Sequence, residues 1–98
     1  MARTSGPIPK APELQDLLNR NVPRERAVLA IRVGELRASR GWTHYGLGQR
    51  AEIHGTYLRQ LEKGERDPGL DLLLRLARAF ELKSLEQLFG ALPTEPLL

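Results

Sequence analysis

The chain has 98 residues, 41% hydrophobic and 28% charged, a composition typical of one small soluble domain with a single core. It contains no cysteine, which excludes disulfides and thiolate metal sites. The opening residues, MARTSGPIPKAPE, hold no long apolar run, and no stretch approaches the ~20 apolar residues of a membrane-spanning helix. We therefore expect neither a signal peptide nor a membrane anchor, and a cytoplasmic location by default.

Basic side chains are unevenly distributed over the chain, whose net charge is +3. Residues 24–66 hold nine Arg or Lys and five Glu, a balance of +4, whereas residues 67–98 have a balance of −2. A basic half attracts phosphate and releases counterions on contact, which favours a nucleic-acid partner. An unevenly charged, solvated surface is the alternative interpretation.

The first predicted element follows a polar, Pro-rich segment. Residues 1–11 are expected to form an arm without regular structure. A proline then opens a short helix over 12–19, in which Leu14, Leu17 and Leu18 stand at spacings of three and one.

The second predicted helix is longer. Asn21, with Pro23 just inside, signals its start, and it runs to about Arg40 before Gly41 ends it. Apolar residues repeat along it at intervals of four and three and form one buried stripe: Leu29, Val33 and Leu36.

Two short helices are predicted next. Thr43 is a good N-cap for a helix over 44–51, and Ile53 lies in the turn that follows. The next helix covers about 55–63 and stops at Gly64. Its inward-facing residues are Leu58 and Leu61.

The last two helices complete an all-α chain. Pro68 is expected to start one, in which Leu70, Leu73, Ala77 and Phe80 share a face. Ser84 and Gln87 form a capping box for a final helix over about 85–90. No segment has the alternating pattern of a β-strand.

The segment LRASRGWTHYGLGQRAEIHGTYLRQLEKGERDPGLDLLLRLARAF resembles the lambda-repressor-like, Cro-type helix-turn-helix family, also called the XRE family. The resemblance covers roughly residues 28–89 and rests on the order and spacing of three motifs. These are Leu36-Arg37 before the glycine, Leu58-x-x-Leu61-Glu62-x-Gly64, and Pro68 followed by Leu73-x-x-Leu76-Ala77. It implies a compact five-helix domain. We therefore expect an N-terminal arm with a short extra helix (1–23), a DNA-binding domain (24–91) and a C-terminal tail (92–98).

The resemblance also implies that helix 55–63 is the recognition helix in the major groove, with helix 44–51 over the DNA backbone. Gln pairs with adenine, Arg pairs with guanine, and the Thr methyl contacts a thymine methyl. For Arg59 the choice between base and phosphate stays open, and simple solvation is the alternative for all of them. The candidate base-contacting residues are Thr56, Arg59 and Gln60, which face away from the apolar side, and Gly55 by resemblance.

Phosphate contacts are expected at helix ends and loops. Thr43 and His44 open a helix whose N-terminus favours an anion. The full set of candidates is Arg37, Arg40, Thr43, His44, Tyr57, Lys63 and Arg66. The resemblance implies a buried or half-buried ion pair between Arg37 and Glu62. His44 and His54 alone do not make a metal site, and no cofactor is expected.

The chain departs from the family pattern at four positions. Relatives usually have Ala at Gly48, Gly at Glu52, Gln at His44, and Ser or Thr at His54. Gly46 and Gly48 each weaken their helix by ~1 kcal/mol relative to Ala, although Gly48 would permit closer helix packing. Glu52 occupies a turn position that usually needs φ > 0, so we expect altered turn geometry. His54 is a poor cap, and these departures favour weak or shape-led recognition.

The leading hypothesis is sequence-specific binding of double-stranded DNA by a transcriptional regulator, a repressor acting as a homodimer. The dimer interface would use either the N-terminal helix or the apolar C-terminal residues Leu85, Leu88, Phe89, Leu92, Leu97 and Leu98, of which Leu88 is expected to pack on its own core. The alternative is a protein-interaction module, such as an antitoxin or adaptor. No nucleophile–base arrangement indicates an enzyme.

Overall fold

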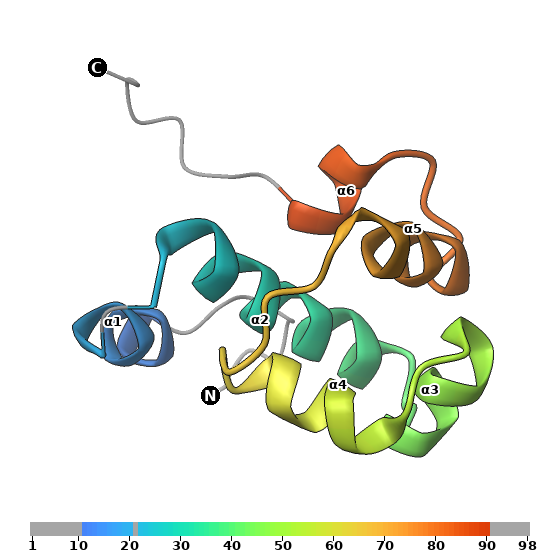
Figure 1. Ribbon diagram of the computed structural model, residues 1–98, viewed down its shortest axis with the longest axis horizontal. Helices are drawn as coiled ribbons and strands as arrows, with labels where there is room; N and C mark the ends of the chain where they lie inside the picture. The colour runs from blue at the N-terminus through green and yellow to red at the C-terminus, as the bar shows by residue number, and fades with distance from the viewer. Residues whose placement is uncertain (1–10, 21, 91–98) are drawn as a thin grey trace.

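The computed structural model describes residues 11–20 and 22–90, and these form helices and no strands (Figure 1). The predicted all-α fold is therefore confirmed. In chain order the helices are α1 (Ala11–Asn19), α2 (Arg24–Ser39), α3 (His44–Ala51), α4 (Gly55–Glu62), α5 (Leu70–Ala79) and α6 (Leu85–Phe89).

The long helix α2 organises the fold, because it contacts α1, α4 and α6. Helix α3 packs on α4 and α5, and α5 packs on α6. Figure 1 shows α1 at one end of α2 and α3 at the other, with α4 on one side and α5 and α6 on the opposite side. Helix α3 thus lies at the end of the molecule farthest from α1, and α4 runs back from it toward α1.

Two apolar clusters hold these helices together. The smaller one joins α1 to α2 through Leu17, Ala27, Ala30 and Ile31. Each large aliphatic side chain removed from water contributes roughly 1.5–3 kcal/mol, so α1 is tied to the folded unit. The larger cluster holds the five helices from α2 through α6 together. It consists of Leu29, Val33, Leu47, Ala51, Leu58, Leu61, Leu76, Phe80 and Leu88.

Most predicted helix ends agree with the structure. Gly41 and Gly64 have φ values of +70° and +78°, the left-handed conformation that ends α2 and α4. The Gln87 amide donates to Ser84 Oγ at 3.3 Å, as a capping box requires. The Gln87 side chain accepts from the Lys83 amide at 2.7 Å, whereas a standard capping box would use the amide of the N-cap residue, Ser84.

Three predicted helix starts were wrong by one or two residues, and the first of these is α1, which starts at Ala11 rather than at Pro12. Helix α5 starts at Leu70 rather than at Pro68, because Gly69 is still extended, with φ −80° and ψ 179°. Pro23 lies just outside α2 as its N-cap and makes no side-chain cap. The predicted start signal at Asn21 lies outside the described residues, as do Leu92, Leu97 and Leu98. The predicted arm over 1–11 also lies outside them, except for Ala11, which belongs to α1.

Among the described residues, the apolar side chains of α6 that were expected to supply surface are buried or partly buried. Leu88 is fully buried, as predicted, and Leu85 and Phe89 pack partly against the core. Of the residues whose burial is described, the exposed large hydrophobic ones are Leu70 and Leu74 on α5 and Tyr45 on α3. Over the described ranges, no helix is long and apolar enough to cross a membrane.

Candidate nucleic-acid interface

The α3–α4 pair is held together by a close backbone approach at Gly48. A Cβ atom at this position would overlap the carbonyl oxygen of Ile53 and would lie 3.4 Å from the Gly55 amide nitrogen. Gly48 is therefore needed for close packing of the two helices. Glycine lowers the stability of α3 as an isolated helix, but this cost is offset by the close packing of α3 and α4 that it permits.

The turn between α3 and α4 retains a left-handed residue despite its side chain. Glu52 has φ 61° and ψ 47°, and its amide donates to the Gly48 carbonyl. The Ile53 amide donates to the same carbonyl at 2.9 Å, and Arg75 on α5 donates to the Glu52 carbonyl at 3.0 Å. The expectation of altered turn geometry was therefore wrong. These hydrogen bonds hold Glu52 in a conformation that costs roughly 1–2 kcal/mol.

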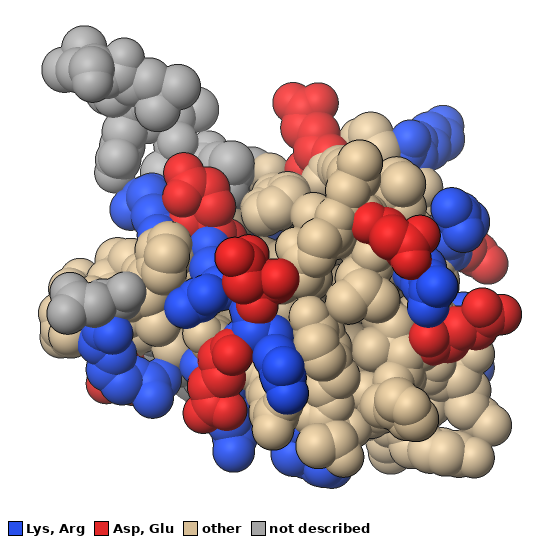
Figure 2. Space-filling view, viewed as in Figure 1, with Lys and Arg blue, Asp and Glu red and all other residues tan. Residues whose placement is uncertain are grey.

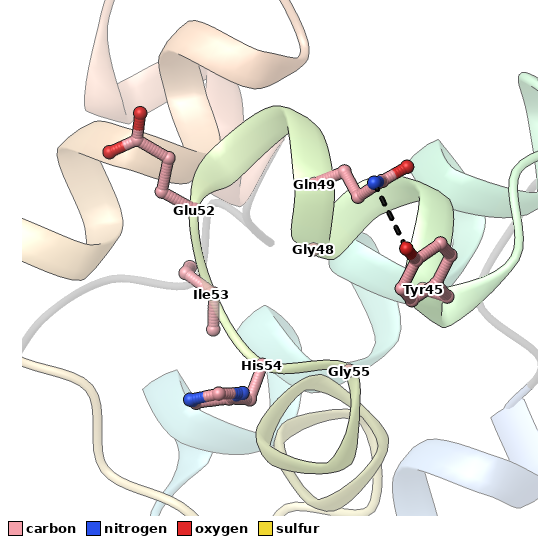
Figure 3. A pocket seen from close by; sticks show the side chains of 7 residues that line it. All are labelled: Tyr45, Gly48, Gln49, Glu52, Ile53, His54 and Gly55. Carbon is pink, nitrogen blue, oxygen red and sulfur yellow. Dashed lines mark hydrogen bonds between the residues drawn. The ribbon is translucent and has the colours of Figure 1, made fainter.

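A shallow hollow of about 280 Å³ lies along this turn. Figure 3 shows Tyr45 and Gln49 projecting from α3 on one side and His54 at the start of α4 on the other. Gln49 donates to the Tyr45 hydroxyl at 3.1 Å. The lining residues are Tyr45, Gly48, Gln49, Glu52, Ile53, His54 and Gly55.

The start of α3 has the predicted cap. Thr43 Oγ1 accepts a hydrogen bond from the Gly46 amide at 2.9 Å. His44, the next residue, packs its imidazole against the end of α4, with Nε2 3.1 Å from Glu62 Oε1. At the start of α4, His54 makes no side-chain cap, in agreement with the sequence.

Arg37 and Glu62 form a bidentate ion pair between α2 and α4. Arg37 Nε lies 2.6 Å from Glu62 Oε2, and Nη2 lies 3.0 Å from Oε1. Nη1 donates to the Trp42 carbonyl at 2.8 Å. The hydrogen bond to Glu62 raises the pKa of Arg37, against the opposing effect of burial. The guanidinium therefore stays charged at any pH at which the protein would be used.

The outward face of α4 carries the candidate base-contacting residues. Thr56 and Arg59 are exposed, whereas Gln60 is half-buried. Gln60 Oε1 accepts from Arg66 Nε at 2.8 Å, and the Arg66 guanidinium lies 5.1 Å from the centre of the Tyr57 ring. Bidentate pairing of Gln60 with adenine needs the same oxygen, so Arg66 has to move before that pairing forms.

The predicted phosphate contacts are not all brought together. Lys63 is exposed at the end of α4, close in sequence to Arg66. Arg40 donates instead to the carbonyls of Leu36, at 3.2 Å, and Phe80, at 3.0 Å. Arg40 therefore caps the ends of α2 and α5.

Sequence reasoning missed an aromatic and cationic cluster beside α3. The rings of Trp42 and Phe80 are stacked with centroids 5.8 Å apart, and the Arg50 guanidinium lies 4.1 Å from the Trp42 ring centre. Arg50 follows Gly46 by one helical turn and donates to its carbonyl. Trp42 and Phe80 are far apart in sequence, so no local pattern indicated the stack.

Charge on the surface is mixed. Figure 2 shows basic side chains along the edge that runs from α1 to the C-terminal end of α4, with acidic side chains between them. Neutral residues cover the area to the right of and below the centre of this view, and further basic and acidic side chains lie at its right-hand edge. The positive balance of residues 24–66 therefore does not form one uniform patch on this face.

A protein-family model described as helix-turn-helix matches residues 33–88, more than half of the chain. The chain belongs to the XRE helix-turn-helix family. The match spans α3, the turn and α4, together with α5. XRE proteins are DNA-binding regulators and are generally not enzymes, so the chain is a DNA-binding regulator of this type. Comparison with curated proteins and with solved structures gives no match.

Proposed function

We propose that the protein is a transcriptional repressor that binds a specific double-stranded DNA sequence, with α4 in the major groove. The observation that carries the proposal is the α3–α4 unit, closed at Gly48 and exposing Thr56 and Arg59. A rigid helix pair with one polar outward face suits insertion into a groove that admits one helix.

In this proposal the first turns of α4 contribute the base contacts. Gly55 lets the backbone approach the DNA, Thr56 meets a thymine methyl group, and Arg59 donates to a guanine or to a phosphate. Gln60 pairs with adenine once Arg66 leaves its oxygen. Arg66 then becomes free to contact a phosphate.

The phosphate contacts position the helix pair without reading sequence. Thr43 and His44 place the N-terminus of α3 against one phosphate, because free helix amides favour anions. Lys63 and Arg66 contact phosphates of the DNA strand that lies at the C-terminal end of α4. Arg37 and Tyr57 contribute as partly buried residues, and Arg40 as an exposed one. The full proposed set is Arg37, Arg40, Thr43, His44, Tyr57, Lys63 and Arg66.

We further propose a cytoplasmic homodimer that meets two half-sites about 34 Å apart. Exposed Leu70 and Leu74 on α5 give apolar surface on the described part of the chain that a second copy would cover. In the division proposed, residues 24–91 bind DNA, 1–23 add the short helix α1, and 92–98 form the tail.

A second candidate is a protein-interaction module such as an antitoxin or adaptor. The observation that favours it is the same exposed pair, Leu70 and Leu74, which suits a different protein as well as a second copy. This module would bind its partner whether or not DNA is present.

Selection from a random DNA pool at two salt concentrations tests the proposed function. Enrichment of a palindrome at both salt concentrations supports a dimeric, sequence-specific regulator. Retention with a steep salt dependence and no enriched sequence indicates non-specific binding. Absence of retention at low salt refutes DNA binding and leaves the protein-interaction module.

Changing Arg59 and Gln60 to Ala tests the recognition face. Each base contact is worth about 1–3 kcal/mol, so each substitution should weaken binding and relax preference at one base pair. Lys83→Ala is the control, because Lys83 is an exposed basic residue between α5 and α6, outside the proposed DNA and dimer surfaces. An unchanged sequence preference in both variants contradicts the assignment.

A further inference from the structure

We infer that His44 is a proton-dependent positioning residue, whose charged form fixes the start of α3 to the end of the recognition helix when DNA binds. The inference rests on the proposed function and concerns its regulation. It predicts that DNA binding takes up a proton and tightens as the pH falls.

The observation that carries the inference is an imperfect contact. His44 Nε2 is buried and lies 3.1 Å from Glu62 Oε1, but the pair lacks the geometry of a directed hydrogen bond. A carboxylate only accepts, so Nε2 carries a proton and the second proton of a charged ring sits on Nδ1. A misaligned contact contributes little to a neutral ring. Coulomb attraction is less dependent on angle, so the contact contributes more when the ring is charged.

Groups from three helices face this imidazole. Glu62 on α4 favours a positive ring, while Arg37 on α2, which shares Glu62 Oε1 at 3.0 Å, opposes it. The free amides at the start of α3 oppose it as well. Glu62 is the carboxylate that contacts His44 within the described part of the chain, and it is already shared with Arg37.

A DNA phosphate at the start of α3 changes this balance. It adds negative charge beside His44 and so favours the protonated ring. By linkage, protonation must then favour DNA to the same extent. Because histidine ordinarily changes charge between pH 5 and 8, the effect falls in a range where the experiment is practicable. Affinity rises as the pH falls, by at most tenfold per pH unit for one proton per subunit.

The chain offers a matched control. It has two histidines, and the other, His54, is an exposed residue at the start of α4. His44→Gln introduces the residue that the family resemblance implies at this position, and it retains a side chain able to donate to Glu62. His54→Gln removes the other imidazole.

The experiment measures the dissociation constant of the full chain for a duplex recovered by the selection, by filter binding at pH 6, 7 and 8 and constant ionic strength. If selection enriches no sequence, a 30-base-pair mixed-sequence duplex is used. We expect wild type to bind about tenfold more tightly at pH 6 than at pH 8, and His54→Gln, which keeps His44, to retain a dependence in the same direction. For His44→Gln we expect the ratio of the dissociation constants at pH 6 and pH 8 to fall to about one, whatever its affinity at pH 8.

Nuclear magnetic resonance of the imidazole protons of the free and DNA-bound chain provides the second readout. His44 should be protonated to a greater extent in the complex than in the free protein at pH 7. Binding that is flat between pH 6 and 8, or that keeps its pH dependence in His44→Gln, overturns the inference and leaves the proposed function standing. Absence of binding at every pH refutes the proposed function itself.

Discussion

Gly48 determines how closely α3 and α4 pack, because the space that a side chain would need is filled by the Ile53 carbonyl. The family resemblance places Ala here, and Ala normally stabilises a helix. At this position of the chain Gly is preferred over Ala, because the Ile53 carbonyl oxygen occupies the space of the Ala methyl group. The effect of substitution is therefore governed by tertiary packing rather than by helix propensity.

Gly48→Ala should lower the free energy of unfolding by about 1–3 kcal/mol, because α4 has to move to admit the methyl group. Gly46→Ala is the matched control in the same helix. Its Cβ would lie 3.3 Å from Thr43 Oγ1 and 3.5 Å from Arg50 Nη1, a flexible end, so stability should stay within about 1 kcal/mol of wild type. Urea unfolding followed by circular dichroism measures both. Equal effects would contradict the role assigned to Gly48.

At Glu52 we predict the opposite effect, namely that substitution stabilises the protein. Its φ of 61° is a conformation that glycine adopts without strain. Glu52→Gly should therefore raise the melting temperature, by an amount equivalent to about 1 kcal/mol after the added entropy of the unfolded chain is subtracted. Glu65→Gly, at an exposed residue without a positive φ, should not stabilise the protein. A destabilised Glu52→Gly variant would show that the side chain contributes something that the backbone geometry does not.

At the level of helices, the ion pair of Arg37 and Glu62 fixes α4 against α2. Both side chains are partly exposed, at 19% and 14%, so the pair lies between a surface salt bridge and a buried one. Its contribution should therefore exceed the ~1 kcal/mol of an exposed pair and stay below the roughly 3–5 kcal/mol lost when a fully buried pair is broken.

A double-mutant cycle with Arg37→Ala and Glu62→Ala isolates this contribution. We expect each single variant to lose about 2–3 kcal/mol of unfolding free energy, and the coupling energy to be about 1–2 kcal/mol. Chemical denaturation at neutral pH measures all four proteins. A coupling energy near zero would mean that the two side chains act independently, through packing alone.

The helices themselves were largely predictable from sequence, because capping residues and apolar periodicity are local signals. Thr43, Gly41 and Ser84 each marked an end correctly. The start of α5 was missed because Pro68 is compatible with both the first helical turn and the preceding extended segment. Glu52 was misjudged because the hydrogen bond from Arg75, 23 residues away, is not a local signal.

Less of the candidate site was predictable. The resemblance placed Arg37 opposite Glu62, and the outward face of α4 followed from spacing. The contact of His44 with Glu62 and the hydrogen bond from Arg66 to Gln60 did not follow, because side-chain direction depends on neighbouring helices. These two contacts have the largest consequences for the proposed DNA binding. The first involves a titratable group, His44, and the second occupies the Gln60 oxygen that would pair with a base.

At the scale of the whole molecule, α1 extends the domain beyond the segment matched by the family model. Leu17 is 6% exposed and packs on α2, and its Cδ2 atom would lie 3.2 Å from a Cβ built at Gly64. One side chain thus connects α1 with α2 and with the residue that ends α4. We therefore expect α1 and the helix-turn-helix to unfold together.

Leu17→Ala should lower the free energy of unfolding by about 2–3 kcal/mol in a single transition, as expected for a large aliphatic side chain removed from a core. Gln15→Ala, at an exposed position of α1, should change it by less than about 0.5 kcal/mol. Circular dichroism across a urea titration measures both. Two separated transitions in wild type would show that α1 is a dispensable arm.

The stack of Trp42 on Phe80 gives the protein an intrinsic optical reporter. Trp42 is the only tryptophan among the 98 residues, so all indole emission comes from the joint between α2 and α3. The indole is only partly exposed, contacts a second aromatic ring and lies beneath the guanidinium of Arg50. Its emission should shift to longer wavelength when this joint opens. Because α1 lies at the opposite end of α2, that shift also reports whether Leu17→Ala loosens the packing around Trp42, at the far end of the molecule.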